Sequence, residues 1–118
     1  MIVGRAPCIS GGMRQRFASD DVQHVPEEPG IYCLYQDRDL VYIGRTPPRI
    51  GLRSELQHAL AIAMAADMHA THFTFELTKN PKTRANEELR SFYETFGRLP
   101  LYNRPHAVDL QQRAELRR

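Results

Sequence analysis

Residues 30–44 read GIYCLYQDRDLVYIG, and the other elements of the chain can be placed outward from this segment. It holds two runs rich in β-branched and aromatic residues, at positions 31–35 and 40–43, separated by the polar residues 36–39. Such runs favour extended strands, and a short polar connection between them is typical of a hairpin. We therefore predict a β-hairpin as the first organised unit.

Three further elements are predicted after the hairpin. Apolar residues recur at helical spacing over residues 52–66, which predicts an amphipathic helix. In residues 72–77 two phenylalanines alternate with polar residues, which predicts a third strand. A second helix is predicted from near Thr83 to Gly97, because glycine readily takes the left-handed conformation that ends a helix.

The two ends of the chain lack comparable periodicity. Residues 1–20 are predicted to form an irregular arm, residues 21–104 the main domain and residues 105–118 a C-terminal tail. Ser19 is predicted to cap a helical turn that stops before Pro26. The expected fold is α+β, a small three-stranded sheet with flanking helices.

Length and composition set limits on the class of protein. A chain of 118 residues fits one domain, and its charged and hydrophobic fractions are those of a globular protein. No apolar run approaches the roughly 20 residues of a membrane span, and the N-terminus has no apolar stretch typical of a secretory signal. We expect a cytoplasmic protein with no membrane contact, in which Cys8 and Cys33 are free thiols.

Positive charge is clustered although the net charge is only +2. Between Asp39 and Glu55 every charged residue is an arginine, and between Glu76 and Glu87 every charged residue is a lysine or arginine. Any affinity for nucleic acid must come from such local clustering.

The tripeptides Gly30-Ile31-Tyr32 and Tyr42-Ile43-Gly44 resemble the pair that names the GIY-YIG nuclease superfamily. The elements after them agree with that pattern, and the resemblance extends from about Glu28 to Asn103, nearly two-thirds of the chain. It implies the GIY-YIG fold.

The resemblance also implies roles for residues of the hairpin. Tyr32 or Tyr42 would help to deprotonate the attacking water, for which a phenol with an ordinary pKa of about 10 needs nearby positive charge. Gly44 would let the backbone approach a phosphate, and Arg45 would hold that phosphate or its neighbour.

On the first long helix the resemblance implies an arginine that binds phosphate oxygens and stabilises the transition state. Arg53 is preferred, because Ile50 supplies the apolar residue expected three positions earlier. Family arginines are usually followed by an apolar residue, however, and here that position belongs to Glu55, which precedes Leu56. In that register a carboxylate would replace the cation and the site would be inactive. His58 is a further catalytic candidate.

The resemblance implies that the second long helix supplies a metal ligand. Glu88, fifteen residues before Asn103, would bind Mg²⁺ or Mn²⁺, and Glu87 is the alternative. Asn103 would hydrogen-bond the ligating carboxylate or a phosphate.

The function implied is that of a metal-dependent endonuclease that hydrolyses phosphodiester bonds, with DNA as the expected substrate. Tyrosine-assisted water would attack phosphorus while the arginines neutralise its oxygens. The main alternative is a nucleic-acid-binding module that kept the fold and lost the chemistry, and the third is a structural or protein-interaction domain. Many relatives carry a separate DNA-reading domain, so we expect a protein partner or a distinctive nucleic-acid shape to supply specificity.

Overall fold

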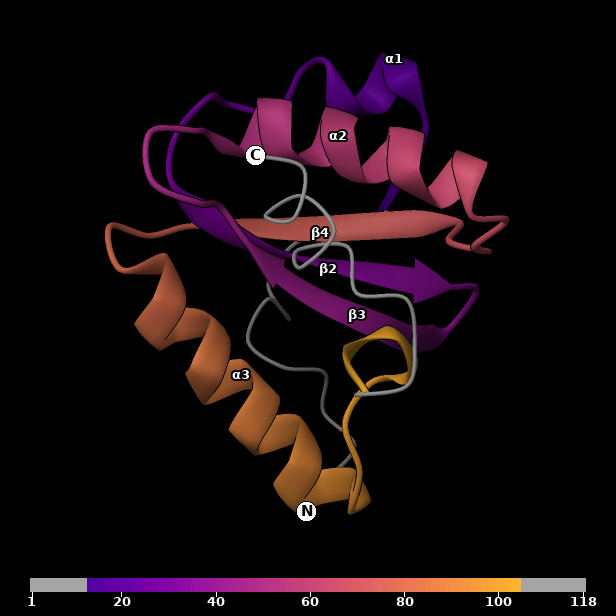
Figure 1. Ribbon diagram of the computed structural model, residues 1–118, viewed down its shortest axis with the longest axis vertical. Helices are drawn as coiled ribbons and strands as arrows, with labels where there is room; N and C mark the ends of the chain where they lie inside the picture. The colour runs from indigo at the N-terminus through magenta and orange to yellow at the C-terminus, as the bar shows by residue number, and fades with distance from the viewer. Residues whose placement is uncertain (1–12, 105–118) are drawn as a thin grey trace.

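The computed structural model describes residues 13–104 as a four-stranded antiparallel sheet with three α-helices (Figure 1). In chain order the elements are β1 (Gln15–Arg16), α1 (Ser19–Val22), β2 (Gly30–Gln36), β3 (Asp39–Arg45), α2 (Leu52–Ala65), β4 (His72–Leu77), α3 (Pro81–Phe96) and the 3₁₀ helix η2 (Leu101–Asn103). The predicted tail, most of the predicted arm and Cys8 lie outside the described residues. Cys33 is a free, buried thiol in β2.

The sheet has the strand order β1-β4-β2-β3, so β2 lies in its interior between β4 and β3. The predicted hairpin is confirmed as β2 and β3, joined by a two-residue turn in which Asp37 has a φ of 55°. Tyr32 pairs with Gly44 of β3 on one side and with Phe75 of β4 on the other. This register fixes the position of Tyr32 within the sheet, with a paired strand on each side.

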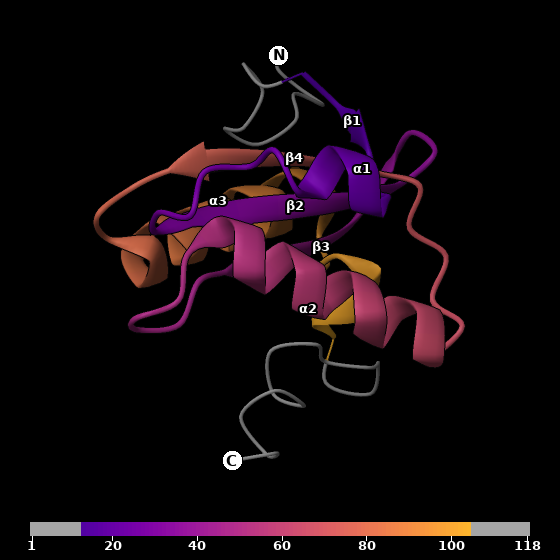
Figure 2. The ribbon, with the colours of Figure 1, turned by 90° about the horizontal axis from the view of Figure 1, so that it is seen from above.

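Helices cover both faces of the sheet. In Figure 1, α1 and α2 lie on one face and α3 on the other, and Figure 2 shows α1 beside α2. Side chains of β2 alternate between the two cores: Tyr32 and Leu34 pack with α2, whereas Ile31 and Cys33 pack with α3. A side chain on one face of β2 is therefore separated by the sheet from a side chain on the other.

Both predicted long helices and the predicted third strand are confirmed. The helix predicted over residues 52–66 is α2, and residues 72–77 form β4. Helix α3 begins at Pro81, two residues before the predicted start, because proline is well accommodated in the first turn. It ends before Gly97, whose φ of 72° is the predicted left-handed cap.

The prediction of three strands was wrong by one strand. β1 pairs with β4 through Gln15 and Arg16 only, and two residues are too few to show an alternating pattern in the sequence. Ala18 takes the N-cap position of α1 and Ser19 is the first residue of the helix, so the predicted capping role of Ser19 was also wrong. Within residues 13–104 no helix has the length and apolar character needed to span a membrane.

Candidate nucleic-acid interface

Tyr32 and Tyr42 lie side by side, but inside the protein. Their ring centroids are 6.0 Å apart at an interplanar angle of 49°, and both side chains are buried in the core beneath α2. The ring of Tyr32 covers Gly44, where an added Cβ would lie 2.6 Å from the phenolic oxygen. The glycine predicted to approach a phosphate therefore accommodates a phenol of the neighbouring strand.

Glu55, and not Arg53, faces Tyr32. The phenol of Tyr32 donates a hydrogen bond of 3.0 Å to Glu55 Oε2, and Glu55 is only 4% exposed. Burial raises the pKa of Glu55 from 4.5 to about 7, against the opposing effects of the Tyr32 hydrogen bond and the charge of Arg45. The side chain that α2 places against this tyrosine is therefore a carboxylate.

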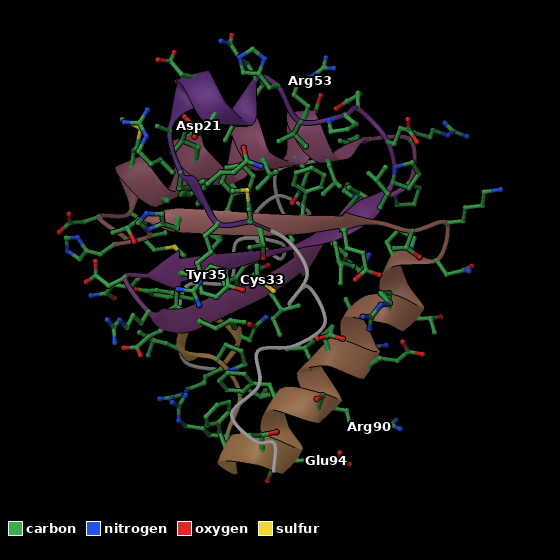
Figure 3. The ribbon with its side chains drawn as sticks, turned by 180° about the vertical axis from the view of Figure 1, so that it is seen from behind. Asp21, Cys33, Tyr35, Arg53, Arg90 and Glu94 are labelled. Carbon is green, nitrogen blue, oxygen red and sulfur yellow. The ribbon has the colours of Figure 1, made fainter. Side chains whose placement is uncertain are left out.

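Arg53 points toward a different part of the molecule. Its Nε donates a 3.0 Å hydrogen bond to the carbonyl oxygen of Val25, in the segment that precedes β2. Figure 3 shows Arg53 on the α2 side of the sheet, away from α3. The sequence held a signal for this outcome, since Leu52, Glu55, Leu56 and Ala59 follow the helical period of the buried stripe and Arg53 does not.

His58 lies on α2 one turn beyond Glu55. Its side chain is partly buried, and its Nε2 is buried with no hydrogen-bond partner among residues 13–104. The structure therefore places His58 on the same helix as Glu55, one turn further along, with one buried ring nitrogen unsatisfied among the described residues.

Glu88 lies on the opposite side of the sheet from the two tyrosines. It is 5% exposed, and its carboxylate accepts a 2.5 Å hydrogen bond from Arg84 Nη1. The same guanidinium binds both carboxylate oxygens of Glu76 on β4, at 2.8 and 3.3 Å, and a more exposed Glu87 at 3.3 Å. The nearby charge of Glu88 adds to burial in raising the pKa of Cys33, whose side chain is in the α3 core.

A guanidinium thus occupies the position beside Glu88 where the resemblance implies a metal ion. In the described part of the chain, no group of three or more His, Cys, Asp or Glu side chains is placed to hold a metal. The side chains present do not fit the implied Mg²⁺ or Mn²⁺, because Arg84 already supplies the positive charge between Glu76 and Glu88.

Asn103 binds the backbone of the hairpin. Its Oδ1 accepts a hydrogen bond from the amide of Ile43 at 2.9 Å, and its Nδ2 donates one to the carbonyl oxygen of the same residue at 3.0 Å. β3 is an edge strand, so this amide side chain satisfies backbone groups that have no neighbouring strand. Asn103 therefore has a structural role in these two hydrogen bonds, in which neither a phosphate nor a carboxylate takes part.

The two positively charged stretches of the sequence meet at one cleft. The end of β3 and the loop after it contribute Arg45 and Arg49, and the loop after β4 with the start of α3 contributes Lys79 and Lys82. The cleft has a volume of about 520 Å³. Arg49, Lys79 and Lys82 are exposed, and none of the three forms an ion pair with another residue in the range 13–104.

One acidic residue, Glu27, also lines the cleft, but its carboxylate is bound to the start of α2. It accepts hydrogen bonds from the Ser54 hydroxyl at 2.6 Å and from the backbone amides of Ser54 and Gly51 at 2.8 and 3.3 Å. The Ser54 hydroxyl, with the two amides, holds the pKa of Glu27 below its ordinary value. The carboxylate therefore caps the helix, and the four cations that line the cleft outnumber this one acidic residue. Sequence analysis identified the cations but not this lining residue.

No protein-family model matches the sequence, and no curated protein matches it with significant similarity. A function for this chain therefore has to be inferred from the geometry of residues 13–104.

Proposed function

We propose that this chain is a nucleic-acid-binding module that holds a phosphate backbone in the cleft and does not cut it. The observation behind the proposal is the convergence on one concave surface of Arg45 and Arg49, at and after the end of β3, with Lys79 and Lys82, after β4. Cations gathered in a concave site attract a polyanion even where the net charge is as small as +2. The resemblance of residues 28–103 to the GIY-YIG superfamily supports nucleic acid as the class of ligand.

Three contacts support binding without hydrolysis. Tyr32 donates to a buried glutamate, Arg53 donates to a backbone carbonyl, and Glu88 is paired with a guanidinium. The tyrosines pack in the core beneath α2, whereas Glu88 lies on α3, which covers the other face of the sheet (Figure 1). A phosphodiester reaction needs its base, cation and metal ligand around one phosphorus atom, and these groups do not gather in that way.

The test is a binding measurement as a function of salt. We expect fluorescence anisotropy of a labelled DNA or RNA to show binding whose log–log dependence on salt has a slope of about −3 to −5, as four or so phosphate contacts require. The double variant Lys79→Gln/Lys82→Gln should bind more weakly, with a slope smaller by about 2.

The matched control is Arg38→Gln/Arg90→Gln, which removes two exposed cations that do not line the cleft. Arg38 lies in the hairpin turn at the far end of β2, and Arg90 points outward from α3 (Figure 3). This variant should keep most of the affinity. Absence of binding to every nucleic acid at low salt, or equal losses in the two double variants, would overturn the proposal.

Metal-dependent endonuclease is the second candidate, favoured by the adjacent Tyr32 and Tyr42 beside Gly44 and Arg45. Incubation of the protein with DNA and RNA in Mg²⁺ or Mn²⁺ separates the two candidates. Metal-dependent cleavage that is lost in both Tyr42→Phe and Glu88→Ala, with folding intact, would replace the binding proposal by the nuclease.

A further inference from the structure

The cleft combines its cations with an apolar lining, which phosphate binding alone does not require. Four of its lining residues are prolines and a fifth is an isoleucine: Pro29, Pro47, Pro48, Pro81 and Ile50. Ile50 is 39% exposed, so its side chain presents apolar surface to whatever enters. The volume of about 520 Å³ lies within the range of small-molecule sites and is far larger than one phosphate group needs.

An apolar lining combined with cations matches the chemistry of one nucleotide unit, which joins a flat base to an anionic phosphate. In a duplex the bases are stacked and paired, so their faces are not available to such apolar side chains. In a single strand the bases can be splayed out and packed against side chains, and this contact tolerates different bases.

The wall that carries the apolar residues is held in place before any ligand binds. The Thr46 amide donates to the carbonyl oxygen of Gly30 at 3.0 Å, and the Thr46 hydroxyl accepts from the Gly30 amide at 3.2 Å. Pro47 and Pro48 fix the next two φ angles, and Arg49 is held at a φ of 71°. A surface fixed in this way loses little conformational freedom on binding, which favours affinity.

We propose that the cleft takes an unpaired nucleotide of a single strand, with its base against Pro47, Pro48 and Ile50 and its flanking phosphates at Arg49, Lys79 and Lys82. This inference rests on the proposed function and narrows its ligand from nucleic acid in general to single strands.

The experiment compares three fluorescein-labelled ligands of equal length at one salt concentration. They are a 12-nucleotide single strand, the same sequence as a duplex, and a 12-unit strand of abasic sugar phosphates that keeps the charges and lacks the bases. Burial of a base against these apolar side chains predicts that the single strand binds several-fold more tightly than the abasic strand. It should also bind more tightly than the duplex.

Ile50→Ser tests the apolar lining itself. We expect it to weaken binding of the single strand several-fold, to leave binding of the abasic strand unchanged and to keep the salt slope. The matched control is Met64→Ser, which alters a side chain that is 75% exposed on α2 and does not line the cleft. Thermal unfolding of both variants shows whether the fold is kept.

The outcomes separate this inference from the proposed function. Equal binding of the abasic and normal strands, or tighter binding of the duplex, overturns the single-strand inference and leaves phosphate binding in place. Displacement of the strand by micromolar adenosine monophosphate also overturns it, in favour of a free-nucleotide site. Binding of none of the three ligands overturns both.

Discussion

Tyr32 donates its phenolic hydrogen to Glu55 Oε2 across 3.0 Å, and both side chains are buried between β2 and α2. A carboxylate in such a place loses its hydration, which disfavours its charged form and raises its pKa. The single hydrogen bond and the charge of Arg45 oppose the effect of burial without cancelling it, because the pKa of Glu55 still lies at about 7. The stability of the protein should therefore depend on pH in the neutral range.

The first prediction concerns this pH dependence. In the unfolded chain Glu55 loses its proton near pH 4.5, whereas in the folded chain it keeps the proton to about pH 7. Between these values the folded state binds more protons, so the free energy of unfolding should fall as pH rises, by about 3 kcal/mol in all. Glu55→Gln cannot ionise, so the variant should lose this decline and be the more stable protein at pH 8. Urea unfolding followed by circular dichroism from pH 4.5 to 8 measures the difference.

Two further variants test whether Glu55 causes this decline of the unfolding free energy with pH. Tyr32→Phe removes a hydrogen bond that lowers the pKa of Glu55, so the decline should move to higher pH. Glu87→Gln alters an exposed carboxylate and should leave the decline in place. A Glu55→Gln protein with the same pH profile as the wild type would show that this carboxyl group does not govern it.

The local pattern of the sequence predicted most elements, because each depends on neighbours within a few residues. The alternation in residues 72–77 and the helical spacing after residue 52 are confirmed as β4 and α2. The short β1 could not be predicted in this way, since Gln15 and Arg16 are placed by their partners on β4.

The candidate site was harder to predict because it depends on which face of the sheet each helix covers. The alternation of side chains along a strand places Tyr32 and Cys33 on opposite faces of β2. No local sequence pattern, however, indicates that α2 packs on one face and α3 on the other. The partner of Glu88 was missed for a similar reason: Arg84 was counted only as one of the positive charges between Glu76 and Glu87, although it lies one helical turn before Glu88 and faces it. The convergence of the two basic stretches likewise depends on the fold.

The second prediction concerns Arg84, whose guanidinium joins Glu76 of β4 to Glu88 of α3. Arg84→Met would leave two partly or fully buried carboxylates without their counter-charge, which should cost about 3 kcal/mol of unfolding free energy at pH 7. Lower pH should restore part of the loss by protonating the carboxylates. Mn²⁺ should raise the melting temperature of the variant but not of the wild type, because the carboxylates would then accept a metal in place of the guanidinium.

Arg90→Met is the control for that experiment, since Arg90 is exposed on the same helix and points away from the sheet (Figure 3). It should change neither the melting temperature nor its response to Mn²⁺. A wild-type protein stabilised by Mn²⁺ as strongly as Arg84→Met would contradict the account of the guanidinium as the resident cation.

The third prediction concerns Asn103, which binds both the amide and the carbonyl group of Ile43. Asn103→Ala leaves both groups of this edge-strand residue without these partners, at a cost of about 1 to 3 kcal/mol. Hydrogen exchange at the Ile43 amide should become faster than in the wild type, while exchange at β4 amides that bond to β2 should change little. Asn103→Asp keeps an acceptor for the Ile43 amide, so it should protect that amide better than alanine does. Equal exchange rates in all three proteins would contradict this role.

The fourth prediction separates two roles for Gly44. An added Cβ would lie 2.6 Å from the oxygen and 2.7 Å from Cε1 of Tyr32, whose buried ring is also held by Glu55. Gly44→Ala should therefore destabilise the protein by about 1 to 3 kcal/mol, as overpacking of a core does. In a Tyr32→Leu background the same change should cost much less, because the ring that causes the clash is gone. Gly97→Ala is the control: its Cβ would meet open space, and its cost arises from the φ of 72°, so that cost should be the same in both backgrounds.

If Gly44 instead served close approach to a phosphate, Gly44→Ala would weaken nucleic-acid binding in both backgrounds. A glycine that only accommodates the phenol predicts unchanged affinity of the folded Gly44→Ala/Tyr32→Leu protein relative to Tyr32→Leu.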